Sequence, residues 1–121
     1  MEYASKAYAK TAKETASPRE LEATLLLKAA ARLQAVQNDI PNKQRELSAA
    51  LLYNRRLWTV FIDSVMQDDN KLPVEVRQNI ANLGVFVMGE TFSLMTKPRP
   101  EHLASLIDIN RGIAAGLRGT A

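Results

Sequence analysis

The stretch QNIANLGVFVMGETFSLMT, residues 78–96, decides the fold of this chain because only one of its nineteen residues, Glu90, is charged. Apolar residues recur in it at the three- and four-residue spacing of a helix, and further apolar residues occupy the other faces. It is not predicted to span a membrane, because its asparagines, carboxylate and hydroxyls would each cost several kcal/mol in lipid. A helix that is apolar nearly all round is typically buried. We therefore expect a largely buried central helix over about residues 73–96.

The rest of the chain predicts amphipathic helices packed around this central helix, in an all-α, compact bundle of about five helices. None of these segments shows the two-residue alternation of a half-buried strand. The first helix has a thin apolar face and is short, so it either docks onto the bundle or stays mobile. The four surrounding helices are expected at about residues 2–15, 18–38, 43–68 and 101–117.

Clear local signals mark where these helices begin and end. Ser17-Pro18-Arg19-Glu20 is a capping box with proline at the first helical position. Ile40-Pro41-Asn42 interrupts the following helix, because proline disfavours helical geometry in the residue before it. Lys97-Pro98-Arg99-Pro100 ends the central helix, since neither proline can donate to a helical ladder. Gly116-Leu117-Arg118-Gly119 is a glycine-containing terminator for the last helix.

Composition indicates one soluble domain, residues 1–121, with a cytoplasmic location. The apolar share of 46% and the charged share of 24% are those of an ordinary globular protein. There is no cysteine, so a disulfide framework is excluded. The net charge of +3 is too mild to indicate nucleic-acid binding by itself.

No catalytic, metal or cofactor site is predicted, and the chain is not expected to be an enzyme. His102 is the only histidine, so neither a Cys/His metal set nor a Ser-His-Asp triad can be built. We expect it to be solvated in the first turn of a helix. Gly84 and Gly89 do not follow a strand, so they do not form a phosphate loop. In a buried helix they would let a neighbouring helix approach closely.

Four asparagines lie on or near apolar helical stripes. Asn54 falls between Leu51 and Trp58, and Asn110 lies on the stripe of the last helix, while Asn79 and Asn82 are three residues apart on the central helix. A buried amide without a partner costs about 1–3 kcal/mol, so these side chains should bond one another, backbone carbonyls or a partner chain. They either form an internal network that fixes helix register or line a groove for a ligand helix.

One basic-aromatic cluster, Tyr53 and Arg55-Arg56 beside Trp58, is compatible with three interpretations. Such residues stack bases and hold phosphates in RNA-binding proteins, and they are common hot spots in protein interfaces. They are equally compatible with plain surface arginines beside a core tryptophan. On one helix Arg55 and Arg56 point about 100° apart, so both cannot face one groove squarely.

Several segments in this order resemble the flagellar biosynthesis regulatory protein family FlaF of alphaproteobacteria. The resemblance extends over nearly the whole chain. The segments are YAKTA (8–12), ASPRELEA (16–23), LLYNRRLW (51–58), LPVEVRQNIANLGVFVM (72–88) and LIDINRGIAAGL (106–117).

This resemblance implies a small cytoplasmic, non-enzymatic factor that binds flagellin and supports its synthesis and export in the manner of a secretion chaperone. It also implies cooperation with the flagellin regulator FlbT, which acts on flagellin messenger RNA. An amphipathic flagellin segment suits a helical groove. The alternative is a post-transcriptional regulator that contacts RNA or an RNA-bound regulator.

The residues expected to contact partners lie on the basic-aromatic cluster and on the polar positions of the apolar helices. A direct RNA binder should bring Arg55, Arg56, Arg77 and Arg111 together on one face. An oligomerisation module should instead show a large apolar self-contact, and the oligomeric state stays open. The candidate partner-binding residues are Tyr53, Asn54, Arg55, Arg56, Arg77, Asn79, Asn82, Asn110 and Arg111.

Overall fold

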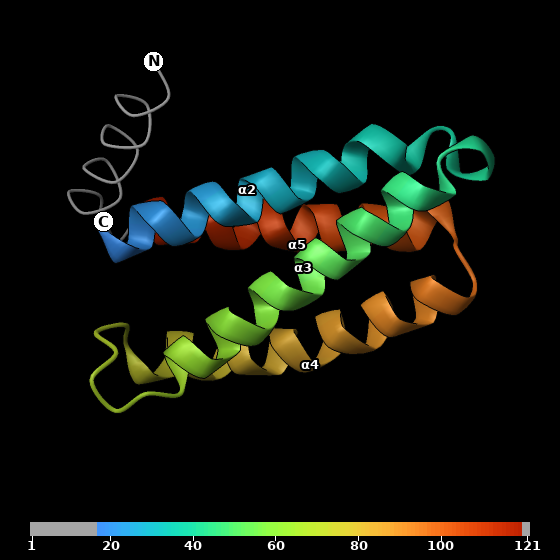
Figure 1. Ribbon diagram of the computed structural model, residues 1–121. Helices are drawn as coiled ribbons and strands as arrows, with labels where there is room; N and C mark the ends of the chain where they lie inside the picture. The colour runs from blue at the N-terminus through green and yellow to red at the C-terminus, as the bar shows by residue number, and fades with distance from the viewer. Residues whose placement is uncertain (1–16, 120–121) are drawn as a thin grey trace, which may run out of the picture.

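The computed structural model describes residues 17–119, and this part of the chain contains helices and turns but no strand (Figure 1). The all-α prediction is confirmed. Of the five expected helices, four are seen, and the one expected over residues 2–15 lies outside the described residues. The elements are α2 (Pro18–Gln37), the short 3-10 helix η1 (Ile40–Asn42), α3 (Gln44–Val65), α4 (Val74–Thr96) and α5 (Pro100–Gly119).

The four helices form two pairs that pack on each other. Helix α2 lies alongside α5 over most of its length, and α3 lies alongside α4 (Figure 1). The pairs meet mainly where α2 packs on α3, whereas α4 and α5 touch only slightly. Helices distant in sequence, α2 and α5, therefore form the most extensive contact, and α3 connects the two pairs.

The predicted start of α2 and the predicted interruption after it are confirmed. Ser17 caps α2, because its hydroxyl accepts a hydrogen bond from the backbone N–H of Glu20 at 3.1 Å. Pro41 lies in η1, which separates α2 from α3. The last helix continues through Gly116 to Gly119, so Gly116 does not terminate it.

The helix at the centre of the hydrophobic core is α3, and not the segment over residues 73–96 that the sequence indicated. Trp58 is fully buried and meets the ring of Phe61 edge-on, with ring centroids 5.5 Å apart. Its helix buries a stripe that reaches α2, α4 and α5. The buried residues of α3 are Leu47, Ala50, Leu51, Asn54, Trp58, Phe61 and Val65.

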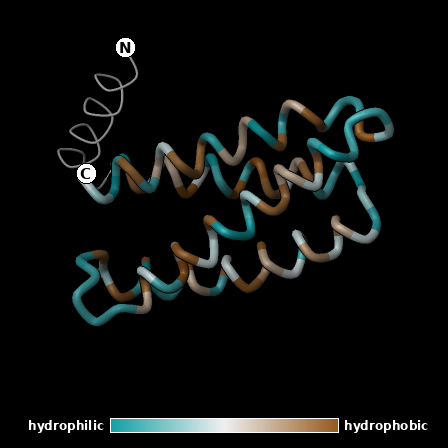
Figure 2. Tube along the Cα trace, viewed as in Figure 1, coloured by the Kyte–Doolittle hydropathy of each residue, from teal (hydrophilic) through white to brown (hydrophobic). Residues whose placement is uncertain are grey.

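The prediction of a largely buried helix over about residues 73–96 is wrong. Helix α4 buries one stripe only, formed by Ile80, Gly84, Val87, Thr91 and Leu94. Its opposite side remains open because α4 packs on α3 and hardly on anything else in the described chain. That open side carries Val85, Phe86 and Phe92 as well as the polar Gln78, Asn79 and Asn82, and Figure 2 shows how few hydrophilic residues the second half of α4 carries. Within residues 17–119, no helix combines the length and hydropathy needed to cross a membrane.

The expectation of a close approach at glycine is confirmed for Gly84 and wrong for Gly89. A Cβ added to Gly84 would lie 2.5 Å from Cδ1 and 2.6 Å from Cγ1 of Ile62 in α3. A Cβ at Gly89 would meet no atom within 4 Å, because Gly89 lies on the open side of α4. Gly84 therefore leaves room for the Ile62 side chain where α4 packs on α3.

Candidate functional site

Two of the four predicted asparagines form a buried network in the centre of the bundle. The indole N–H of Trp58 donates to Asn110 Oδ1 at 2.9 Å, and Asn110 Nδ2 donates to Asn54 Oδ1 at 2.7 Å. Asn110 Nδ2 also lies 3.5 Å from the carbonyl oxygen of Leu26 in α2. The network therefore joins α2, α3 and α5, so Asn54 and Asn110 bond inside the bundle, as the interpretation of an internal network expects.

Asn54 is the incomplete member of this network. Its side chain is fully buried, yet its Nδ2 has no hydrogen-bond partner among the described residues. An unpaired buried N–H of this kind opposes folding by about 1–3 kcal/mol. Asn54 and Asn110 are closed off from solvent, so they cannot reach a partner while the bundle stays folded.

Asn79 and Asn82 have a different environment from the one expected. Both lie on the exposed side of α4. Asn82 Oδ1 accepts a hydrogen bond from Gln78 Nε2 at 3.1 Å, one turn earlier on the same helix. The expectation that they share a buried stripe is wrong, since the stripe that α4 buries faces α3.

Arg77 binds the end of α3. Its Nε donates to the carbonyl oxygen of Val65 at 2.7 Å and its Nη2 to that of Gln67 at 2.8 Å. Terminal carbonyls of a helix have no partner within the helix and carry a partial negative charge, so a guanidinium satisfies them well. Arg77 thus ties the start of α4 to the end of α3.

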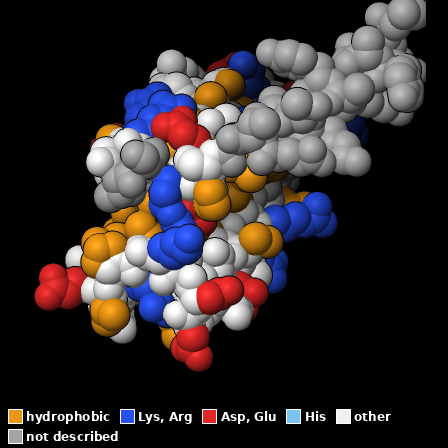
Figure 3. All heavy atoms as spheres, turned by 90° about the vertical axis from the view of Figure 1, so that its left-hand side faces the viewer, with side chains coloured by type: hydrophobic (Ala, Val, Ile, Leu, Met, Phe, Trp, Pro, Cys, Tyr) orange, Lys and Arg blue, Asp and Glu red, His pale blue; other side chains and the backbone are white. Residues whose placement is uncertain are grey.

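The four arginines proposed as an RNA-binding face lie in three separate places. Arg55 and Arg56 are exposed in the middle of α3, where they line a shallow hollow with Leu52, Thr59 and Val60. Arg77 lies at the end of α3, and Arg111 on α5 has its Nη2 3.5 Å from Gln34 Oε1 of α2. At the end of the molecule shown in Figure 3, hydrophobic, basic and acidic side chains alternate and do not form one basic surface.

Tyr53 lies at the middle of a groove between α2 and α3. Two cations from α2 lie over its ring, with Arg32 Cζ 4.5 Å and Lys28 Nζ 5.8 Å from the ring centroid. Cations this close to an aromatic face are attracted by its quadrupole. On either side of this contact the two helices leave a hollow, and we call the two hollows with Tyr53, Lys28 and Arg32 the α2–α3 groove.

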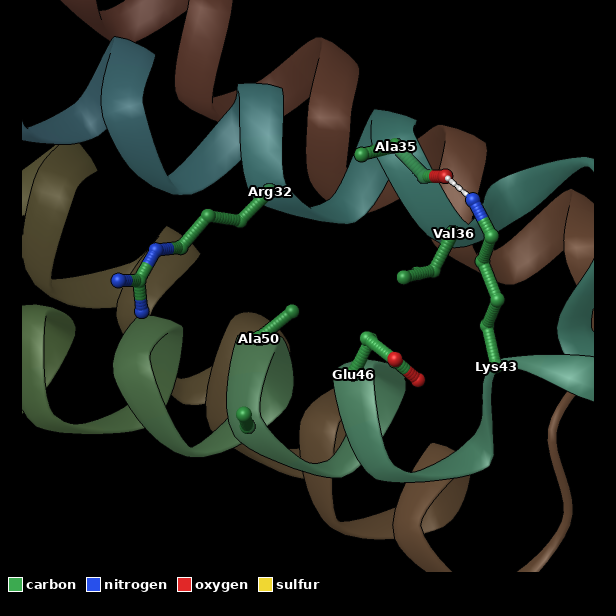
Figure 4. A pocket seen from close by; sticks show the side chains of 7 residues that line it. Arg32, Ala35, Val36, Lys43, Glu46 and Ala50 are labelled. Atoms are coloured by element: carbon green, nitrogen blue, oxygen red, sulfur yellow. Dashed lines mark hydrogen bonds between the residues drawn. The ribbon is translucent and has the colours of Figure 1, made fainter.

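The larger hollow of the groove lies towards η1, at the end where α2 and α3 are joined. Its volume is about 320 Å³. In Figure 4, Arg32, Ala35 and Val36 enter it from α2 and Glu46 and Ala50 from α3, while Lys43 closes one side. Lys43 Nζ donates to the carbonyl oxygen of Ala35 at 3.3 Å. The floor is therefore apolar and the rim is charged.

The smaller hollow, about 170 Å³, lies between the first half of α2 and the second half of α3. Its only ionisable lining residue is Glu22, whose carboxylate pairs with Arg19 at 2.5 Å. Burial raises the pKa of Glu22, and the attraction of Arg19 offsets this only in part. The lining residues are Leu21, Glu22, Leu25, Leu26, Leu57, Val60, Phe61 and Ser64.

The spacing of the two hollows matches a helix lying along the groove. Ala49 lines the larger hollow and Val60 the smaller one, eleven residues apart on α3. At 1.5 Å per residue this is about 16 Å, or three helical turns. The sequence indicated Tyr53 but missed Lys28 and Arg32, because they lie on another helix and only the packing of α2 on α3 brings them to the ring.

His102 has a partner that the sequence did not indicate. Its Nδ1 lies 2.6 Å from Glu90 Oε2, and this contact joins α5 to α4 where the two helices otherwise barely meet. The expectation that His102 is simply solvated is therefore wrong. In the described part of the chain, no three His, Cys, Asp or Glu residues gather in a way that could hold a metal ion.

Comparison with known proteins identifies the family. The family model for flagellar protein FlaF matches residues 4–117, which is nearly the whole chain, so the chain belongs to the FlaF family. No curated protein and no solved structure matches the chain. The resemblance noted in the sequence is thereby confirmed, and the protein is a flagellar one.

Proposed function

We propose that the protein binds an amphipathic segment of flagellin in the α2–α3 groove. This proposal starts from its membership of the FlaF family. In this role the protein would support flagellin synthesis and export as a secretion chaperone. The observation that carries this proposal is the pair of apolar-floored hollows on one line, separated by the cations over Tyr53. A helix that lays its apolar face into a groove is a common mode of peptide recognition.

The chemistry of the groove specifies what the bound segment should look like. Two apolar side chains about eleven residues apart would fill the hollows, and an acidic or amide side chain between them would meet Lys28 and Arg32. Flagellin termini are amphipathic and fold only on assembly, so an unassembled terminus can supply such a segment. We place the segment between α2 and α3 because two hollows lie on one line there, on either side of the cations over Tyr53.

We further propose that FlbT acts together with this complex. The exposed Arg55 and Arg56 remain available beside the groove for a companion protein or for RNA. Because the four arginines do not share one face, we favour contact with a protein over direct contact with RNA.

The test compares two valines that are both exposed and lie on different faces. Val60 is 68% exposed and lines the smaller hollow, and Val85 is 76% exposed on the open side of α4. Val60→Glu places a charge in the groove and should weaken flagellin binding at least about tenfold. Val85→Glu is the matched control and should bind flagellin like the parent. Equal binding by all three proteins would refute the assignment of the groove.

A salt titration and nuclease treatment test the remaining alternative. Apolar burial resists salt, so binding to flagellin should persist at about 0.5 M salt, where surface charges are strongly screened. A steep loss of affinity with salt, or loss of the complex after nuclease treatment, would indicate recognition through RNA instead.

A further inference from the structure

The open side of α4 carries a mainly apolar stripe, interrupted by Gln78, that the rest of the described chain leaves exposed or half-buried. Its residues repeat with the alternating three- and four-residue spacing of a coiled-coil seam. Val74 and Val85 are 75% and 76% exposed, and Phe92 is 70% exposed. We call this stripe the α4 seam, and its residues are Val74, Gln78, Ala81, Val85, Met88, Phe92 and Met95.

We propose that the α4 seam binds the α4 seam of a second copy of this chain, with the two helices antiparallel. A seam can bind a copy of itself only if it is complementary to itself under a two-fold rotation. The size of the side chains along the seam meets this condition. Its first half carries the smaller residues Val74, Ala81 and Val85 together with Gln78, and its second half carries the larger Met88, Phe92 and Met95.

In its inner layers, the antiparallel arrangement pairs a smaller residue with a larger one. In a two-stranded antiparallel coiled coil the seam residues meet in layers, and one register places Ala81 opposite Phe92 of the other copy. The same register places Val85 opposite Met88 and Gln78 opposite Met95, each layer occurring twice by symmetry. Facing large and small residues is how packed layers interdigitate without voids. A parallel pairing would set Phe92 against Phe92 and leave a gap at Ala81.

The charge distribution favours a second copy over a foreign amphipathic helix. Between residues 78 and 96 the only charged residue is Glu90, and it is turned to His102 of α5. Coiled coils select their partners largely through charged residues beside the seam. From Gln78 onward the exposed positions beside the seam are Asn82, Gly89 and Thr96, which neither attract an oppositely charged helix nor repel an identical one, while the charged Glu75 lies beside Val74 at the start of the seam.

The surroundings of the seam leave room for the second helix. A Cβ built on Gly89 meets nothing within 4 Å, so the backbone of α4 is open to close approach at this point. From Gln78 to Met95 the seam is about 26 Å long at 1.5 Å per residue. The α2–α3 groove uses other helices, so this inference does not rest on the proposed function.

Cysteine cross-linking tests the pairing directly, because the chain has no cysteine of its own. Purified Ala81→Cys and Phe92→Cys proteins are oxidised separately and as a mixture. The antiparallel register predicts disulfide-linked dimers mainly in the mixture, joining residue 81 of one chain to residue 92 of the other. Dimers that form mainly within each single variant would show a parallel pairing and overturn the proposal.

Light scattering across a range of protein concentrations provides the second readout. The parent protein should shift from monomer towards dimer as its concentration rises, and this shift should be insensitive to salt. Val85→Glu should weaken dimerisation at least about tenfold, because it buries an unpaired charge in each half of the interface. Val60→Glu should leave dimerisation unchanged. A parent protein that stays monomeric at the highest concentrations, or equal effects of the two substitutions, would refute the proposal.

The two valine substitutions also separate this inference from the proposed function. Val85→Glu is expected to weaken the dimer and keep flagellin binding, while Val60→Glu is expected to weaken flagellin binding and keep the dimer. The dimer and the flagellin-binding groove are therefore tested independently, and either proposal can be refuted while the other stands. Thermal melting of both variants checks that the fold is kept, which is expected because both side chains are largely exposed.

Discussion

Replacing Asn110 by leucine should strongly destabilise the protein, because Asn110 satisfies two other buried polar groups. Its amide oxygen accepts the indole N–H of Trp58 at 2.9 Å, and its amide nitrogen donates to Asn54 Oδ1 at 2.7 Å. All three side chains are fully buried. Asn110→Leu roughly keeps the volume but leaves both neighbours without this partner. Each orphaned group costs about 1–3 kcal/mol, so the expected loss is about 2–6 kcal/mol.

A loss of this size is a large part of the stability of a small domain, which is typically about 5–15 kcal/mol. Each kcal/mol lowers the melting temperature of a domain of this size by about 4 °C. Trp58→Phe removes only the indole N–H and part of the ring, and it leaves the oxygen of Asn110 unpaired. Trp58→Ala should cost more, about 3–5 kcal/mol, because it also opens a cavity against Phe61.

The double variant Trp58→Phe/Asn110→Leu decides whether the hydrogen bond is the cause. If it is, removing both partners should cost about 1–3 kcal/mol less than the sum of the two single variants. Urea unfolding followed by far-ultraviolet circular dichroism suits all four proteins, since Trp58 is the only tryptophan and its fluorescence is lost in two of them. Additivity within about 0.5 kcal/mol would refute the reasoning.

Three further predictions concern single positions. Gly84→Ala should lower the melting temperature because its Cβ would collide with the half-buried Ile62 side chain of α3. Gly89→Ala, in open space, should stabilise the helix by up to about 1 kcal/mol. Equal effects in thermal melts would contradict this. Arg77→Ala should cost about 1.5–3 kcal/mol in urea unfolding through its two bonds to the end of α3, while Arg56→Ala should stay within about 0.5 kcal/mol. The raised pKa of Glu22 means that folding favours its protonated form, so its charge opposes stability above that pKa and the effect disappears as pH falls through it. Glu22→Gln should therefore raise the melting temperature at neutral pH, and this gain should vanish once the pH falls below the ordinary pKa of a glutamate.

Much of the fold could be predicted because it depends on short-range signals. The cap at Ser17 and the interruption at Pro41 are local events, and both are where the sequence places them. The pairing of Asn54 with Asn110 was also foreseeable, since a polar side chain on a buried stripe must find a partner. Their positions on the apolar stripes were enough to indicate that they are buried. These positions did not show which helices would meet.

The site residues were harder to predict, because their roles depend on how the helices pack. Arg77 is separated from Val65 by a turn, and nothing local shows that its guanidinium reaches back to the end of α3. Lys28 and Arg32 look like ordinary surface cations until α2 lies against α3 and brings them over Tyr53. Sequence periodicity identifies which face of a helix is apolar, but it does not say which helix covers that face.

The same limit explains the error over residues 73–96 and gives it a physical meaning. Hydropathy shows that a surface is more stable away from water, and it does not distinguish burial inside a chain from burial between chains. Helix α4 buries only its Ile80–Leu94 stripe within the described bundle, so the apolar residues on its other side still favour burial. Exposed apolar stripes of this kind commonly mark interaction sites. The pattern that suggested a central helix therefore becomes the reason to expect a partner for α4, and the pairing of large with small residues along the seam is what points to a second copy of the chain as that partner.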